Sequence, residues 1–597
     1  MEFLNSGLLA SAWGAALLSA VLLIAYRLGG WVLDLTGHYT LSLSRNEIRI
    51  FSSALGLIVI SYGVLLLGLF KHLYRAEALL FLLICFLIGF RFKDRRAHAQ
   101  STEASRPLWE KWLWAGIISA FFLSWAQAAS PPIGNDALAY HLYHPKEFIL
   151  HGEIFRVPFS RESLWPYQTE MLFTLGLLLQ GTMLAQFFHW LFFVLCAGAV
   201  YTFTKRFYQR RAAVIAAAAF VFCPAAFAQA GQAYVDLSFA FFTFLTIYAF
   251  CLNEAIGERR AAVLSGLFCG GALATKYLAL SLAAVLALLW VIRSKERLRT
   301  FAYFVLSSAL VSGIWYVRSW VVAGNPVYPF FPEIFGRGIA FDAGAGVGMG
   351  KGLLDFLKFG WNVSVHPESF GGEMIGPLFF LFLPLLLLPV EKKSSRAFYL
   401  FLFSFLYIFL LFHQSQQARF YLSLVPLLAV GVGVSVANLT GKKGFLRTIG
   451  ILVFVAVLFL HAGVYVYRLR NSWPVILGLE SPKDYLSRFE RSFNGYLYFQ
   501  KNAKPDEKIF NFADVRHFYN ANPGMLHCTP AFRAWLKAEN KTIPDYLNEH
   551  PFEYIWLRED SEFHLQEYAL SHGYRLVHAY EQREGAGLFR YQVFRRS

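Results

Sequence analysis

The sequence predicts an all-α protein that crosses a membrane about fourteen times and ends in a small α/β domain. Of its 597 residues, 57% are hydrophobic and 15% are charged, whereas soluble domains have roughly 25% charged residues. Apolar runs of about 20 residues, long enough to cross a hydrocarbon core of roughly 30 Å as helices, recur up to residue 467. Examples are residues 8–25, 50–70 and 183–204.

Residues 1–111 are predicted to form N-terminal membrane helices and a cytoplasmic loop. We interpret residues 8–25 as a retained helix, because no basic residue precedes this run and further spans follow it. The net charge of +16, from 54 basic and 38 acidic residues, arises mainly in short loops between apolar runs. This pattern is typical of an orientation signal facing anionic cytoplasmic lipid, so no nucleic-acid partner is expected.

Loops rich in lysine and arginine set the predicted orientation. Six are placed in the cytoplasm: residues 91–111, 205–211, 254–260, 293–299, 391–396 and 442–447. This placement requires residues 261–292 to cross twice, as two short helices that meet near Lys276. Broken helices occur where backbone lines a protein cavity, which predicts a cavity near Lys276. The module at residues 112–467 then has its large outside loops at residues 130–170 and 323–372.

Residues 468–597 are predicted to form the α/β domain, outside the cytoplasm. Within it, residues 508–512 and 554–557 have the pattern of short strands. Residues 532–539 and 561–572 have the pattern of helices, and residues 575–595 that of a hairpin that turns at residues 584–587.

The first large outside loop carries the first candidate residues. Asp136 follows a predicted membrane helix closely, so it is expected at the outer membrane interface. Helical spacing places Tyr140 on the same face as Asp136, with His141 and His144 one turn apart. Two alternatives stay open: Asp136 caps an interfacial helix, or Asp136, His141 and His144 bind a metal ion.

Three further charged residues stand out at or inside apolar segments. Asp236 begins an apolar helix on the same side as Asp136. An acid at this position is suited either to complementing the helix dipole or to a site where a hydroxyl is deprotonated. Lys276 lies in an apolar stretch where an unpaired ammonium costs about 2.5 to 3.5 kcal/mol, so we expect it to face a cavity or a partner. Arg419 lies at the start of a helix on the outside. Its guanidinium is suited either to binding a phosphate or to extending toward the lipid headgroups.

Together, residues 111–466 resemble the GT-C superfamily of membrane glycosyltransferases, in particular the protein O-mannosyltransferases and the lipid A aminoarabinose transferases. Many relatives have Asp-Glu where this chain has Asn135-Asp136. The matching features are the acid Asp136 after the helix that opens the first outside loop, the proline-led helix at residues 165–180, the second acid Asp236, the pair Thr275-Lys276 in a broken helix, and the late segment Gln417-Ala418-Arg419-Phe420-Tyr421.

The resemblance implies an enzyme that moves a sugar from a polyprenyl-phosphate donor to an acceptor hydroxyl, with inversion. Asp136 is then the general base, Asp236 a second acid, and Arg419 with Lys276 the ligands of the donor phosphate. The acceptor is a glycan, a lipid or a protein; no cofactor is required, and a divalent metal stays open as an alternative. Residues expected to support the site or face the acceptor are Tyr140, His141, His144, Lys146 and Gln417.

The resemblance also implies a location in the inner, cytoplasmic membrane with a periplasmic tail. A lipid-linked sugar flippase or transporter is an alternative, because broken helices and intramembrane charges also mark substrate pathways. Another is a polysaccharide polymerase or ligase with a lipid diphosphate donor. The transferase interpretation requires Asp136, Asp236, Lys276 and Arg419 to converge on one pocket.

Overall fold

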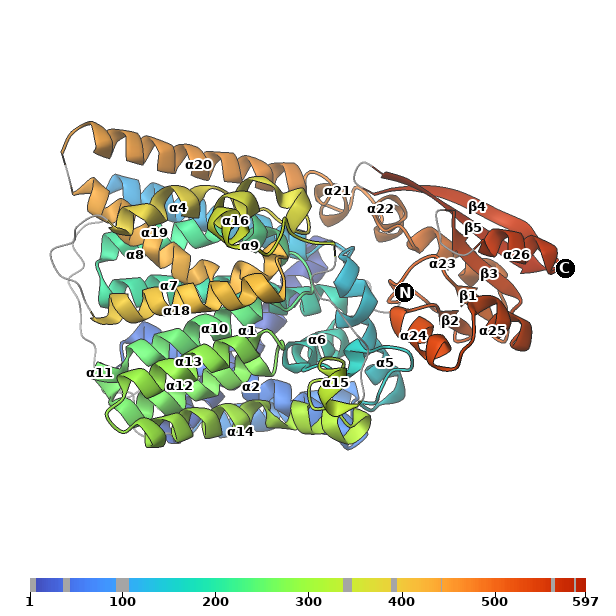
Figure 1. Ribbon diagram of the computed structural model, residues 1–597, viewed down its shortest axis with the longest axis horizontal. Helices are drawn as coiled ribbons and strands as arrows, with labels where there is room; N and C mark the ends of the chain where they lie inside the picture. The colour runs from blue at the N-terminus through green and yellow to red at the C-terminus, as the bar shows by residue number, and fades with distance from the viewer. Residues whose placement is uncertain are drawn as a thin grey trace.

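The computed structural model describes residues 7–35, 43–92, 107–336, 346–387, 395–441, 443–559, 564–584 and 587–597. A bundle of helices is followed by a small α/β tail, which extends beyond one end of the bundle (Figure 1). Parts of the predicted loops 91–111, 323–372, 391–396 and 442–447, of the predicted helix 561–572 and of the turn at 584–587 lie outside the described residues.

The bundle begins with three N-terminal helices, α1 (Leu8–Leu35), α2 (Arg45–Leu69) and α3 (Arg75–Gly89). The longer helices that follow are α4 (Leu108–Ala128), α5 (Tyr143–His151), α6 (Gln168–Leu179), α7 (Thr182–Phe207), α8 (Arg210–Val221), α9 (Pro224–Ala230), α10 (Asp236–Cys251), α12 (Glu258–Leu273), α13 (Ala279–Arg293), α14 (Arg297–Ala323), α16 (Leu353–Val365), α18 (Ser395–Gln414), α19 (Val425–Thr440) and α20 (Phe445–Leu469). Short turns of helix join them: η2 (Ala137–His141), η3 (Glu162–Leu164), α11 (Asn253–Ile256), α15 (Pro332–Phe335), η4 (Pro367–Phe370), α17 (Leu378–Phe382), η5 (Leu383–Leu387) and η6 (Ala418–Ser423).

The protein is a multi-pass membrane protein, but the predicted count of about fourteen spans is not confirmed. Six described helices are long and apolar enough to cross a membrane, or seven if α8 and α9, which meet at 64°, form one bent span. The helices α6, α10, α13 and α19 are apolar but have only 10–17 residues. Other helices cover nearly all of α6 and α10.

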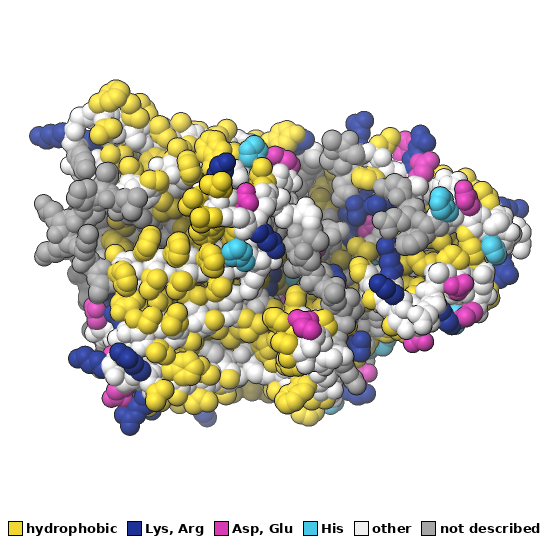
Figure 2. Space-filling view, viewed as in Figure 1, with side chains coloured by type: hydrophobic (Ala, Val, Ile, Leu, Met, Phe, Trp, Pro, Cys, Tyr) yellow, Lys and Arg dark blue, Asp and Glu magenta, His cyan; other side chains and the backbone are white. Residues whose placement is uncertain are grey.

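The outer helices expose large apolar side chains on the flank of the bundle, including Phe398, Phe401 and Phe405 of α18. Helix α20 does the same with Leu452 and Phe459. Figure 2 shows hydrophobic side chains across this flank, with charged side chains gathered on the tail and at the opposite end of the bundle. This distribution fits a bundle whose flank contacts lipid.

Several of the predicted basic loops meet at the end of the bundle away from the tail, where α11 lies (Figure 1). Glu254 accepts contacts from Arg293 and Arg396 at 3.3 and 3.4 Å, which joins three of these loops. Arg210 of a fourth loop pairs with Glu110 at 2.9 Å. The position of these loops at one end of the bundle agrees with the alternation of cytoplasmic and outside loops that the lysine and arginine residues predict.

The predicted break in residues 261–292 is confirmed. Helix α12 ends at Leu273 and α13 begins at Ala279, with Lys276 in the turns between them. The carbonyl of Ala274 in this break accepts a hydrogen bond from the backbone N–H of Gln168, at the start of α6, at 3.0 Å. Lipid chains could not hydrogen-bond to the backbone groups that this break frees. Another part of the protein supplies the hydrogen bond instead.

Helices α1 and α2 pack closely because each has a glycine at their crossing. A Cβ atom on Gly56 would clash with the backbone carbonyl of Ala25, and one on Gly29 would clash with that of Ser52. We expect Gly56→Ala to cost about 1–3 kcal/mol through overpacking and to lower the unfolding temperature in detergent. Gly313→Ala in α14, where the added Cβ meets no described atom within 4 Å, is the control. Equal losses in both variants would contradict the crossing as the cause.

The tail begins with α21 (Trp473–Ile476), α22 (Pro482–Phe489) and α23 (Phe493–Asn502). Its five-stranded sheet has the order β2-β1-β3-β5-β4, with β1 parallel to β2 and β3, and β5 antiparallel to β3 and β4. The remaining elements are β1 (Ile509–Asn511), β2 (Met525–His527), α24 (Pro530–Ala538), α25 (Ile543–Glu549), β3 (Tyr554–Arg558), α26 (Leu565–Ser571), β4 (Tyr574–Glu584) and β5 (Gly587–Arg596).

The sheet has an apolar core on each face, which explains why the tail forms a layered α/β unit. Along β3, Tyr554 and Trp556 belong to one core, and Ile555 and Leu557 to the other. The period of two is the pattern of a strand buried on both sides. The predicted strands at 508–512 and 554–557, the helix at 532–539 and the hairpin are confirmed. Strand β2 was not predicted.

Candidate active site

Asp136 lies just after α4, at the start of a single π-helical turn, η2. The hydroxyl of Tyr140 donates a hydrogen bond to Oδ2 of Asp136 at 3.0 Å. Tyr140 therefore lies on the same face as Asp136, as predicted. The side chain of Asp136 makes no capping hydrogen bond to the described backbone of η2. The carboxylate is therefore turned toward side chains from elsewhere in the fold, and the capping alternative is not supported.

Arg419 supplies the main partner of Asp136. Its Nη2 atom donates to Oδ2 of Asp136 at 2.6 Å, and the two side chains are 15% and 16% exposed. The guanidinium also lies over the rings of Tyr234 and Phe420, at 5.3 and 5.5 Å from the ring centroids. Arg419 thus faces the protein interior at the start of η6 and does not snorkel away from it.

Asp236 and Lys276 form a second ion pair beside the first. Nζ of Lys276 donates to Oδ1 of Asp236 at 2.7 Å, and Lys276 lies 4.0 Å from the centroid of the Phe420 ring. Phe420 therefore contacts the cation of each pair. The structure brings the four predicted charged residues, which are scattered over 283 positions of sequence, into one group.

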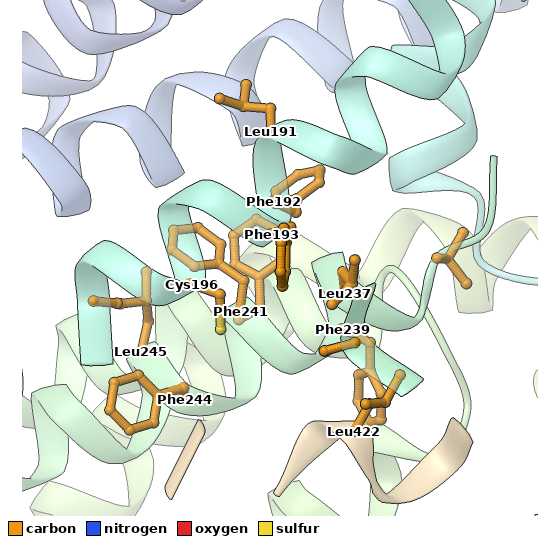
Figure 3. Packing of buried hydrophobic residues seen from close by; sticks show 14 of the residues in the cluster. Leu191, Phe192, Phe193, Cys196, Leu237, Phe239, Phe241, Phe244, Leu245 and Leu422 are labelled. Atoms are coloured by element: carbon orange, nitrogen blue, oxygen red, sulfur yellow. The ribbon is translucent and has the colours of Figure 1, made fainter. Parts of the chain in front are cut away.

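Packing of α7 on α10 holds Asp236 at the start of α10. The rings of Phe192 and Phe241 lie 5.8 Å apart between these helices, and Leu422 of η6 lies beside Phe239 of α10 (Figure 3). This apolar contact places η6, and with it Arg419, against the helix that begins with Asp236. The charged group is thus positioned by a core of aromatic and aliphatic side chains.

His189 of α7 orders the turn that leads into α10. Its Nδ1 lies 2.7 Å from the carbonyl oxygen of Gln232, and its Nε2 accepts from the N–H of Leu237 at 3.1 Å. One ring nitrogen therefore donates and the other accepts, as in a neutral imidazole. The turn so held contains Tyr234, whose hydroxyl accepts from the N–H of Asp136 at 3.4 Å.

The charge of Asp136 depends on its partners. Burial would raise its pKa, but Arg419, with smaller contributions from His141 and Tyr140, holds the pKa well below its ordinary value. Because the folded pKa is lowered, the pair stabilises the fold above the ordinary pKa of aspartate. That contribution is lost as the pH falls through the lowered value. Asp136 is therefore an anion at neutral pH, but a weak base while Arg419 faces it.

His141 and His144 do not join Asp136 in a metal site. Nδ1 of His141 lies 2.8 Å from Oε1 of Glu170. Both ring nitrogens of His144 are engaged, with the hydroxyl of Tyr167 at 2.7 Å and that of Ser160 at 2.9 Å. In the part of the chain that the structure describes, no three His, Cys, Asp or Glu side chains are arranged to hold a metal ion. The arrangement of these described side chains thus does not support the metal alternative for this trio.

Lys146 and Gln417 contact other parts of the fold. Nζ of Lys146 donates to the backbone carbonyls of Phe518 and Asn520 in the tail, at 2.8 and 2.6 Å. The side chain of Gln417 packs against Gly371. The role of Lys146 in the site stays a prediction; in the structure its ammonium docks the tail onto α5.

We expect Lys146→Met to loosen this docking, because two carbonyls lose a charged donor and each such bond contributes about 1.5–3 kcal/mol. Amide hydrogens at residues 515–522 should exchange roughly tenfold or more faster than in the unmodified protein. Lys537→Met, on the exposed face of α24, removes a lysine from the same domain and is the control. Unchanged exchange in Lys146→Met would show that other contacts hold the tail.

A crevice of about 490 Å³ lies between the loop after α4 and the tail. Asp136 and Tyr140 form part of its wall, whereas Arg419, Lys276 and Asp236 do not. The backbone bonds from His517 and Phe518 to the carbonyl of Leu138, at 3.2 and 3.1 Å, fix the tail at one side of it. Asp136 therefore faces a crevice on the tail side and a pair of cations on the membrane side.

Residues 165–336 match a family model described as a domain of unknown function (DUF8201). No curated protein matches the sequence. Among solved structures, ArnT from Cupriavidus metallidurans bound to undecaprenyl phosphate aligns with a TM-score of 0.53 at 14% identity, over 81% of this chain and 97% of that chain. The apo form of ArnT aligns equally well, at 15% identity. The chain has the GT-C fold.

Two further GT-C structures align over more limited parts of their length. The arabinofuranosyltransferase AftD from Mycobacteria has a TM-score of 0.43 at 15% identity, over 82% of this chain and 40% of that chain. The oligosaccharyltransferase of Archaeoglobus fulgidus, solved with a tethered acceptor peptide, has a TM-score of 0.44 at 13% identity, over 74% and 69% of the two chains.

Within this GT-C fold, four residues of the site were not predicted from the sequence. Tyr234 and Phe420 bracket Arg419, His189 orders the turn before Asp236, and Glu170 holds His141. Tyr234 and Phe420 adjoin predicted residues in sequence, which is a usable signal. His189 lies inside the long apolar helix α7, where a histidine needs a partner, and that observation marks it too.

Proposed function

We propose that this protein is a membrane glycosyltransferase that moves a sugar from a polyprenyl-phosphate donor to an acceptor hydroxyl, with inversion. One observation carries the proposal: Asp136 stands between a tail-side crevice and the cations Arg419 and Lys276. A transferase needs a base at this position, because the acceptor hydroxyl must lose its proton as it attacks the anomeric carbon on the side opposite the bond to the leaving phosphate. The GT-C fold, shared with a protein solved with undecaprenyl phosphate, supports the same conclusion.

The reaction follows from this arrangement. The acceptor oxygen attacks the anomeric carbon and its proton passes to a carboxylate oxygen of Asp136. The bond between the anomeric carbon and the phosphate oxygen breaks, and the phosphate leaves with the electron pair. The polyprenyl monophosphate gains negative charge, which Arg419 and Lys276 stabilise. A single displacement inverts the configuration at the anomeric carbon.

The donor phosphate also changes the basicity of Asp136. Without donor, Arg419 is engaged by Asp136 and keeps that carboxylate a weak base. When the phosphate draws the guanidinium away, burial of Asp136 is no longer offset, and its proton affinity rises. Asp236 keeps Lys276 in place through the second ion pair. The base is thus expected to become competent as the donor binds.

The test is transfer by the purified protein in liposomes. A mixture of polyprenyl-phosphate sugars is supplied with candidate acceptors, and the product anomer is determined by NMR. We expect sugar transfer with inversion, on the face of the membrane that bears the tail, which we place in the periplasm. Retained configuration would contradict single displacement. Movement of labelled donor across the bilayer without transfer would favour the flippase alternative, and activity restricted to lipid diphosphate sugars would favour the polymerase or ligase.

A further inference from the structure

The crevice beside Asp136 has the size and position of a binding site. Its volume of about 490 Å³ falls in the range of roughly 300–1,000 Å³ typical of small-molecule sites. One wall comes from the loop after α4 and from α5. The other comes from the tail, from the segment that connects β1 to β2 and from β2 itself. A molecule in the crevice would therefore contact both parts of the protein and reach Asp136.

The lining of the crevice offers hydrogen bonds, and its charged side chains are more acidic than basic: Asp136, Glu147 and Glu162 against Arg161. Arg161 is paired with Glu162 at 2.6 Å. Burial raises the pKa of Glu147, and it lowers the pKa of His144 and His527 well below 6.5 and that of His517 to about 3. Such a surface does not suit a phosphorylated or other anionic molecule. Aromatic rings of Tyr143 and Phe155 add apolar faces to it.

His527, at the end of β2, carries a polar atom that lacks a hydrogen-bond partner among the described residues. The amide of Asn511 is oriented by the N–H groups of Ala513 and Asp514, which donate to its Oδ1 at 2.9 and 3.2 Å. Its Nδ2 therefore donates to Nδ1 of His527, at 2.9 Å. In a neutral ring the proton must then be on Nε2.

Nε2 of His527 is buried and has no hydrogen-bond partner in the part of the chain that the structure describes. The residue is 8% exposed and lines the crevice. A buried N–H donor without an acceptor costs about 1–3 kcal/mol, which a ligand oxygen would recover. The atom needed is an uncharged acceptor such as a hydroxyl oxygen, because the surroundings carry little positive charge.

We propose that the crevice is the acceptor subsite, that the acceptor is a neutral, hydroxyl-rich carbohydrate, and that His527 of the tail recognises one of its oxygens. This inference rests on the proposed function, since it treats the molecule beside Asp136 as the acceptor. Hydroxyl groups match both the donors and the acceptors of the lining, and sugar rings present apolar faces to aromatic side chains. The tail then contributes to acceptor choice and not to the chemical step.

The test uses the full-length protein in detergent and saturation-transfer NMR. The probes are maltotriose, mannotriose and xylotriose, with an uncharged serine- and threonine-rich octapeptide as the competing class. We expect signals from at least one oligosaccharide, at least fivefold weaker in His527→Ala and in Val515→Trp, which fills the crevice from the 36% exposed Val515. His572→Ala and Leu570→Trp, at exposed positions of α26 and its end, should keep the signals.

The outcomes separate this inference from the proposed function, because undecaprenyl phosphate binding is measured on the same samples. Signals from the peptide alone, or from no probe while undecaprenyl phosphate binds, would overturn the carbohydrate subsite and leave the transferase. Oligosaccharide signals that His527→Ala and Val515→Trp do not weaken would also overturn the subsite. If both variants weaken the oligosaccharide signals but the protein does not bind undecaprenyl phosphate, the subsite is supported. The proposal of a polyprenyl-phosphate donor is then contradicted.

Discussion

Asp136→Asn is expected to lower the rate of sugar transfer by roughly 10²- to 10⁴-fold, the usual contribution of a general base. The amide keeps the size of the carboxylate but cannot take the acceptor proton. Affinity for polyprenyl phosphate should stay the same or increase, because the amide no longer competes for Arg419. The measurements are single-turnover transfer and equilibrium binding of undecaprenyl phosphate.

Asp506→Asn, at an exposed position of the tail, is the control for the loss of one negative charge. It should leave both measurements unchanged. A folded Asp136→Asn protein that transfers sugar at the original rate would remove Asp136 from the base role. A protein that loses donor affinity together with rate would show instead that the carboxylate holds Arg419 in the shape that binds phosphate.

The charged residues of the site were predictable because ionisable groups are costly in apolar segments. Lys276 in particular stands out, since an ammonium in such a stretch needs a partner or a cavity, and the structure supplies Asp236 at 2.7 Å. Which acid pairs with which cation was not predictable. Asp136 and Arg419 are 283 positions apart, and they meet through tertiary packing, including that of η6 on α10.

Other features depend on tertiary contacts that leave no local pattern. The ammonium of Lys146 binds carbonyls 372 and 374 positions away, so its role in docking the tail could not be read from the first outside loop. Phe420 contacts both cations, yet one aromatic residue is inconspicuous in a chain that is 18% aromatic. The count of about fourteen spans stays a prediction for a related reason, because hydropathy does not distinguish burial in protein from burial in lipid.

Arg419→Gln is expected to reduce turnover by roughly 10²- to 10³-fold, the cost of removing one preorganised group that stabilises charge in a transition state. Unlike Asp136→Asn, it should also weaken binding of polyprenyl phosphate. Arg419→Lys should recover part of the loss, since it restores the charge but not the planar fork. Arg470→Gln, at an exposed arginine near the end of α20, is the control and should change neither quantity.

The pH profile gives Arg419→Gln a second signature that a merely misfolded site would not show. With Arg419 present, the pKa of Asp136 is held well below its ordinary value. Without it, burial is the dominant influence and raises that pKa. The acid limb of kcat/KM for the donor, which reports the free enzyme, should therefore move to higher pH in Arg419→Gln. An acid limb at the original pH would contradict the ion pair as the cause of the low pKa.

The double variant tests the competition between Asp136 and the donor phosphate for one guanidinium. If Asp136 restrains Arg419, then Asp136→Asn tightens undecaprenyl phosphate binding when Arg419 is present and has no effect on it in Arg419→Gln. Contacting residues usually show such coupling, on the order of 0.5–3 kcal/mol. Additive effects on binding would mean that phosphate and Asp136 use different faces of Arg419, and the donor would then have no means of raising the basicity of Asp136.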